Sequence, residues 1–151
     1  MADLIFQGGL LAMRDGSLDP TPDVRLILVM TDTTCDTEKD TLTMAGFTTI
    51  DEFDGVGYVE IDCANVVWAY DSGSGEYRLD FDDEFFNVPP ATVAPATRDA
   101  QGMVLYLFVD GTDANDIPIA FTDSGGFPFN AANGDIDFQV HADGFLFLRQ
   151  A

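Results

Sequence analysis

Basic residues are scarce in this chain. Its 151 residues include six Lys and Arg, of which Lys39 is the only lysine, against 27 Asp and Glu, so the formal net charge is −21. Nucleic acids and anionic membranes attract proteins through patches of Lys and Arg, and a surface this negative repels phosphate. We therefore expect neither nucleic acid nor membrane among the partners.

Cysteine and histidine, the common ligands of structural zinc, are also few. Cys35 and Cys63 have no CxxC neighbour, and His141 is the only histidine. A structural zinc site needs about four ligands of these kinds. We expect no disulfide, two small buried or half-buried thiols and no cofactor. No Ser or Cys can be tied to His141 as a nucleophile, so the sequence predicts a protein that is not an enzyme.

Long apolar runs are also missing. None reaches the roughly 20 residues of a transmembrane helix, and the N-terminal segment MADLIFQGGLLAMRDG is acidic too early for a secretory leader. We expect a soluble chain made in a reducing cytoplasm. A chain of this length can build one core without a disulfide or metal. We predict a single β domain over residues 1–151, with residues 1–22 as an N-terminal arm or helix.

Helical patterns are thin, although 46% of the residues are hydrophobic and thirteen are Phe. Apolar and small residues recur at helical spacing over 3–14, which predicts a short amphipathic helix ended by Asp15-Gly16. The pair Gly8-Gly9 weakens this prediction by about 1 kcal/mol per glycine. A second short helix is predicted over 37–44, ending at Gly46.

Strand patterns cover most of the rest. VRLILVM at 24–30 is a continuous apolar run, typical of a central strand covered on both faces. Further strands are predicted over 57–70 with a bend near Asn65, over 76–81 after a turn at 71–75, and over 102–110 and 117–121. Residues 135–140 and 144–150 are expected to form a closing hairpin. The fold class is all-β: an antiparallel β-sandwich or barrel-like sandwich with a short N-terminal helix.

Acidic turns raise the question of calcium. The turn DGTDAND at 110–116 places Asp110, Asp113 and Asp116 in close order, and Ca²⁺ takes about six to eight oxygen ligands. The turn lacks the EF-hand pattern, and Asp and Asn also dominate turns because their side chains bond the neighbouring backbone. These three residues are weak candidates for a metal site.

Two aromatic groups and one proline-rich stretch are candidates for contacts. Trp68 and Tyr70 lie at strand spacing and so share a face. Phe127-Pro128-Phe129 lies in a Gly-rich turn, where an exposed tip would mark a protein contact. Residues 88–100 are rich in Pro and small residues, as in a crossover between sheets or a rim loop that contacts a neighbouring subunit.

The order of these features resembles a known family. The segment TDTTCDTEKDTLTMAGFTTIDEFDGVGY after the first long strand, above all Asp51 to Tyr58, and the pair GMVLYLF and IPIAF around a polar turn are similar to small virion proteins of tailed phages. The resemblance covers nearly the whole chain. It rests on strand and turn patterns rather than on catalytic signatures.

The resemblance implies a capsid decoration, or cement, protein. Such a protein is a small β domain, commonly a homotrimer, that is made in the host cytoplasm and binds the major capsid protein on the outer surface of the virion. Interface candidates are taken from the arm at 2–14, the proline-rich stretch and the FPF turn. They are Leu4, Phe6, Leu10, Arg14, Pro89, Pro90, Pro95, Phe127 and Phe129.

Two alternatives stay open. One is a neck or tail component of a phage particle with the same fold. The other is a β-sandwich that binds calcium or carbohydrate, with Trp68, Tyr70 and the Asp-rich turns as its site.

Overall fold

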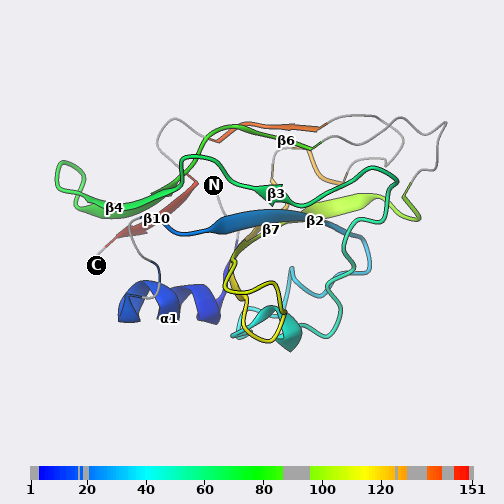
Figure 1. The fold of residues 1–151 in the computed structure, drawn as a ribbon, viewed down its shortest axis with the longest axis horizontal. Coiled ribbons are helices and arrows are strands. Elements are labelled where there is room, and N and C mark those ends of the chain that lie inside the picture. The colour runs from blue at the N-terminus through cyan, green and yellow to red at the C-terminus, as the bar shows by residue number, and fades with distance from the viewer. Residues whose placement is uncertain are drawn as a thin grey trace.

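A five-stranded antiparallel sheet forms the centre of the molecule. The computed structural model describes residues 4–16, 18, 21–86, 96–124, 126–128, 136–140 and 145–149. The sheet has the order β1-β8-β7-β2-β3, and Figure 1 shows β2, β3 and β7 near the middle of the molecule. Its strands are β1 (Leu4–Ile5), β8 (Ile117–Thr122), β7 (Ala100–Leu107), β2 (Val24–Met30) and β3 (Ile61–Asp62).

Two smaller antiparallel sheets complete the β structure. One has the order β10-β5-β4, from β10 (Leu146–Arg149), β5 (Glu76–Asp80) and β4 (Val67–Asp71). The other pairs β6 (Glu84–Phe86) with β9 (Ile136–Phe138). The predicted all-β class with a short N-terminal helix is confirmed.

The predicted hairpin between 135–140 and 144–150 is wrong. β9 pairs with β6, and β10 pairs with β5 from Leu146 opposite Leu79 to Arg149 opposite Glu76. This arrangement places Phe145 in the core, with its ring centroid 5.4 Å from that of Phe81. Two strands this short bury little against each other, and by pairing with β5 instead, β10 joins a three-stranded sheet.

The central sheet is buried on both faces, as the run VRLILVM predicts. Alternate residues of β2 enter two different clusters: Leu26 and Leu28 pack in the larger one with Leu79 and Phe145, whereas Ile27 packs on the opposite face. The second cluster is covered by the loop between β2 and β3. It comprises Phe6, Ile27, Val29, Cys35, Met44, Phe47, Val104, Tyr106 and Phe121.

Helix α1 (Gln7–Asp15) begins later than predicted, because Leu4 and Ile5 pair with Phe121 and Ala120 of β8 instead. It ends as predicted at Gly16, whose φ of 82° is the left-handed conformation of a helix C-cap. The helix packs closely on β8: a Cβ atom at Gly9 would lie 2.7 Å from the Cα atom of Ile119. Glycine therefore sets the distance between helix and sheet.

The helix predicted over 37–44 does not form. Turns occupy this segment, followed by a single 3₁₀ turn, η1 (Met44–Gly46). Thr41 Oγ1 donates to the Glu38 carbonyl at 2.8 Å, and Thr37 Oγ1 donates to the Thr34 carbonyl at 3.2 Å. Threonine side chains that bond local backbone in this way compete with the hydrogen bonds of a helix.

Candidate functional site

The hairpin of β4 and β5 carries a row of aromatic side chains on one face. The register places Trp68 opposite Leu79 and Tyr70 opposite Tyr77, so the four side chains share that face. The rings of Trp68 and Tyr77 stack with centroids 5.4 Å apart and an interplanar angle of 18°. The ring of Tyr70 lies 5.1 Å from that of Tyr77. We call Trp68, Tyr70 and Tyr77 the aromatic face.

Exposure rises along this face toward the tip of the hairpin. Trp68 is 9% exposed and belongs to the larger core, whereas Tyr77 is 47% and Tyr70 57% exposed. The hairpin extends outward past the end of the central sheet (Figure 1). The aromatic face therefore begins in the core and continues into solvent.

Within the β4–β5 hairpin, the aromatic face carries no charged side chain. Asp71, Glu76, Arg78 and Asp80 alternate with the aromatic residues and so belong to the opposite face of the two strands. An uncharged surface of this kind stands out in a chain with a net charge of −21. Sequence alternation correctly placed Trp68 and Tyr70 together, but it did not bring in Tyr77, which needs the register of the hairpin.

Asp71 fixes the tip of the hairpin. Its carboxylate accepts the Gly73 N–H at 2.8 Å and the Ser74 hydroxyl at 3.1 Å, and it pairs with the Arg78 guanidinium at 3.0 Å. These hydrogen bonds, first that from Gly73 and then that from Ser74, lower the pKa of Asp71. The turn is thus held by groups within the hairpin, which presents the aromatic face in a defined geometry.

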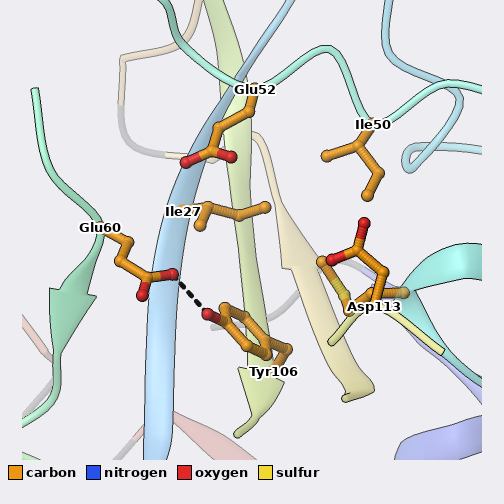
Figure 2. Close-up of a pocket in the computed structure, with 7 residues that line it drawn as sticks. Ile27, Ile50, Glu52, Glu60, Tyr106 and Asp113 are labelled. Carbon is orange, nitrogen blue, oxygen red and sulfur yellow. Dashed lines mark hydrogen bonds between the residues drawn. The ribbon is translucent and has the colours of Figure 1, made fainter. Parts of the chain in front are cut away.

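A pocket lined by carboxylates lies on the second face of the central sheet. Its volume is about 280 Å³, and Figure 2 shows Glu60 and Asp113 at opposite sides of it. Ile27 of β2 and Tyr106 of β7 form the part contributed by the sheet, and Glu52 comes from the loop that covers it. Met44 and Ile50 complete the lining.

The carboxylates of this pocket are bound by neighbouring side chains. Glu60 accepts a hydrogen bond from the Tyr106 hydroxyl and another from Arg25 Nη1 at 2.5 Å. The Arg25 guanidinium in turn lies over the Phe108 ring, 3.4 Å from its centroid. Glu60 thereby joins β2, β7 and the segment before β3, so its role is structural.

Glu52, in the same pocket, has a raised pKa. Burial raises its pKa, against the effect of a hydrogen bond with Tyr58, whose hydroxyl also accepts the Leu28 N–H at 3.0 Å. Burial likewise raises the pKa of Tyr58. Glu52 and Glu60 face one pocket, but each is engaged with groups that hold the loop against β2. Among the described residues, His, Cys, Asp and Glu side chains form no cluster that could hold a metal ion.

The three weak metal candidates do not converge. Asp116 is 3% exposed, and its Oδ1 accepts the backbone N–H groups of Val109, Asp110 and Gly111 at 2.8, 3.3 and 3.4 Å. Asp110 accepts hydrogen bonds from Thr112 and Asn115, which lower its pKa. Asp113 instead lines the pocket that also contains Glu52 and Glu60. The turn uses Asp110 and Asp116 to fold itself, as Asp-rich turns commonly do.

The N-terminal interface candidates have different environments. Leu10 is 44% exposed and Arg14 is also exposed, so both lie on the outer surface of α1. Leu4 is half-buried in β1. Phe6 is fully buried and packs edge-on against Phe47 at 5.1 Å, so its prediction as a surface contact is wrong. It follows β1 directly and points into the second cluster.

The FPF turn is only partly described. Phe127 is half-buried and packs against the larger core, whereas Pro128 is exposed. Phe129, Pro89, Pro90, Pro95 and His141 lie outside the described residues.

Both cysteines are free and buried, as predicted. Across the described segments, no helix is long and apolar enough to cross a membrane. No protein family, curated protein or solved structure matches the chain.

Proposed function

We propose that this chain is a non-enzymatic structural protein of a phage virion, a capsid decoration protein that binds the outer surface of the head and stabilises it. The observation that carries the proposal is the uncharged aromatic face on a hairpin that projects from a strongly acidic β domain. Tyr and Trp anchors contribute most of the binding energy at many protein interfaces.

The state of the carboxylates supports a role without catalysis. Glu60 is bound by Arg25 and Tyr106, and Asp116 is bound by three backbone N–H groups. A general acid or base must be within reach of a substrate proton, whereas these groups are occupied by the fold itself. The arrangement favours a rigid domain that acts through its surface.

The proposed partner is the major capsid protein, met by the aromatic face, with the exposed residues Leu10 and Arg14 of α1 as further contact candidates. A homo-oligomer suits this role because linked copies bind a repeating shell with an avidity that exceeds the affinity of one copy. The negative remainder of the surface would face the medium, where it disfavours adsorption to DNA and anionic membranes. The chain would be made in the host cytoplasm.

Cosedimentation with heads assembled without this protein tests the proposal. We expect saturable binding, reduced about tenfold or more when Tyr70 and Tyr77 are both replaced by Ser, since interface tyrosines are frequent hot spots. A Val109→Ser variant serves as the control, because Val109 is 52% exposed in the loop after β7. Heads that take up none of the wild-type protein would refute the proposal. Binding only at the neck or tail, seen by electron microscopy, would favour that alternative.

A second candidate function is carbohydrate binding. The stacked rings of Trp68 and Tyr77, with Tyr70 beside them, offer a flat apolar surface without local charge. A glycan array separates the two functions: binding of one sugar class, lost in a Tyr70→Ser variant, would replace the decoration proposal. Calorimetry with Ca²⁺ tests whether such binding needs the ion.

A further inference from the structure

The outer edge of β4 is free within the described part of the chain. β4 lies at the edge of the sheet β10-β5-β4 and pairs only with β5, over all five of its residues and without a bulge. The edge strands of the central sheet, β1 and β3, have two residues each. β4 is therefore the longest edge strand among the described residues.

This edge lacks the usual protection against pairing. Edge strands avoid association by being short, by carrying Lys or Pro, or by a bulge that twists the edge away. The sequence of β4, VWAYD, contains neither Lys nor Pro, and three of its five residues are aromatic or β-branched. Val67, Ala69 and Tyr70 are exposed. The strand is thus a template for another strand.

We propose that β4 pairs antiparallel with β4 of a second copy of this chain, on a two-fold axis through Ala69. Ala69 would then face Ala69 of the second copy, and Trp68 would face Tyr70 of the second copy on both sides of the axis. Val67 would face Asp71 of the second copy. Two three-stranded sheets become one six-stranded sheet, and the two aromatic faces adjoin.

Register and charge select this pairing. It is the only antiparallel register in which all five residues of β4 meet β4, and it places no carboxylate opposite another. Centring the pair on Asp71 would set Asp71 opposite its own copy, which is unfavourable for like charges in directly opposed positions. The Asp71 charge is also compensated by Arg78 at 3.0 Å. Aromatic residues opposed across the strands add to the stability of the pair.

The charge on β4 indicates which partner pairs with its free edge. β4 itself carries one charged side chain, Asp71, which already pairs with Arg78 at 3.0 Å, so the strand offers no unpaired carboxylate to a cationic partner. An edge strand whose single charge is compensated, and which is self-complementary in register, fits a second copy. Long-range repulsion between two chains of charge −21 opposes the contact, and salt screens it over a Debye length of about 8 Å at physiological ionic strength. The pairing should therefore strengthen with salt, while a cationic partner would be released.

Disulfide trapping tests the position of the axis. Opposed residues of antiparallel strands have Cα atoms about 4.5–5.5 Å apart, which suits a disulfide. We expect an Ala69→Cys variant to form a covalent dimer under mild oxidation at moderate salt. A Val67→Cys variant should not, because its two sulfurs would start from Cα atoms about 13 Å apart along the strands. The wild-type chain is the control, since Cys35 and Cys63 are buried.

Charge substitutions at Val67 test the register by the sign of their effect. A Val67→Glu variant places a second carboxylate opposite Asp71 of the second copy. At the same salt concentration, its dimer affinity in sedimentation should be about tenfold lower than that of the wild type. A Val67→Lys variant pairs with the same aspartate and should keep or tighten the dimer. Val109→Glu, on an equally exposed valine outside the hairpin, should change little.

The outcomes separate cleanly. Trapping through position 69 but not 67, with opposite effects of Glu and Lys at 67, supports the two-fold contact. A chain that stays monomeric at every salt concentration and leaves the Ala69→Cys variant untrapped overturns it. Self-association that ignores both Val67 variants overturns it as well, because the contact then lies elsewhere. None of these results depends on whether the chain decorates a capsid.

Discussion

Replacing Gly9 by Ala changes two opposing contributions to the stability of the fold, helix propensity and packing. In the interior of a helix, Ala is more favourable than Gly by about 1 kcal/mol, so propensity alone predicts a stabilised protein. The structure predicts the reverse, because a Cβ atom at Gly9 would lie 2.7 Å from the Cα atom and 2.9 Å from the carbonyl oxygen of Ile119. Both are backbone atoms of β8 and cannot rotate away.

The size of the effect follows from the two opposing contributions. To relieve the overlap, α1 must move away from β8, although Phe6 at its start is fully buried and its N–H donates to the Ile119 carbonyl at 3.0 Å. Overpacking of this kind costs about 1–3 kcal/mol. Because the overlapping atoms of Ile119 are backbone atoms, the cost lies in the upper half of that range, at about 2–3 kcal/mol. After the gain of about 1 kcal/mol in propensity is subtracted, we expect a net loss of about 1–2 kcal/mol in the free energy of unfolding.

Urea denaturation followed by the fluorescence of Trp68 measures this loss. The midpoint of the Gly9→Ala variant should fall with an unchanged slope, which indicates a loss of stability without a change in the denatured state. Gln7→Ala is the matched control: Gln7 is exposed on the same helix, so Ala should be neutral or slightly stabilising there. A Gly9→Ala variant as stable as the wild type would refute the close contact between α1 and β8.

Four further predictions concern the thiols and the charges. Burial raises the pKa of Cys35 to about 11 and also raises that of Cys63, so Ellman's reagent at pH 8 should label neither thiol in the folded protein and both after denaturation. Burial raises the pKa of Glu52 above its unfolded value, so the contribution of this residue to stability is lost as the pH rises through the folded pKa. At pH 7 the Glu52→Gln variant should therefore unfold at a higher temperature than the wild type. A lower unfolding temperature would contradict this. Hydrogen bonds from Thr48 and Thr34 lower the pKa of Glu38, so the contribution of this residue to stability is present above the unfolded pKa and is lost as the pH falls. In thermal melts, Glu38→Gln should therefore destabilise the protein at pH 7 but hardly at pH 3. The melting temperature of the wild type should rise with added NaCl, because screening reduces the self-repulsion of a chain with charge −21, and a fall would count against a mainly electrostatic effect.

Much of the fold follows from local pattern. The continuous apolar run at 24–30 correctly indicated a strand buried on both faces, and β7 and β8 form the predicted hairpin around the polar turn. The bend near Asn65 is also real, since this residue has a φ of 52° between β3 and β4. Such features depend on residues close in sequence, where periodicity and turn chemistry are informative.

The misplaced elements depend on distant partners. Nothing in residues 136–149 reveals that β9 extends β6 and β10 extends β5, because pairing across many residues is decided by the remainder of the core. The predicted helix at 37–44 was lost to threonine side chains that bond the backbone of their own loop. Phe6 looked like part of a surface arm, yet the short pairing of β1 with β8 directs it inward.

The candidate site was predictable only in part. Period-two alternation placed Trp68 beside Tyr70, but the addition of Tyr77 required the register of β4 and β5. The pocket combines Glu52 and Glu60 of the loop between β2 and β3 with Asp113 of the loop between β7 and β8, and no spacing in the sequence indicates that the two loops meet. Contact through the aromatic face remains a proposal that rests on its exposure and its lack of charge.

Electron cryomicroscopy of heads incubated with the purified protein tests the central proposal most directly. The proposed function predicts density for this domain on the outer surface of the shell, with the aromatic face of the β4–β5 hairpin buried against the major capsid protein. The same map would contradict it if the heads stayed bare, or if the domain were bound with Tyr70 and Tyr77 turned to the medium.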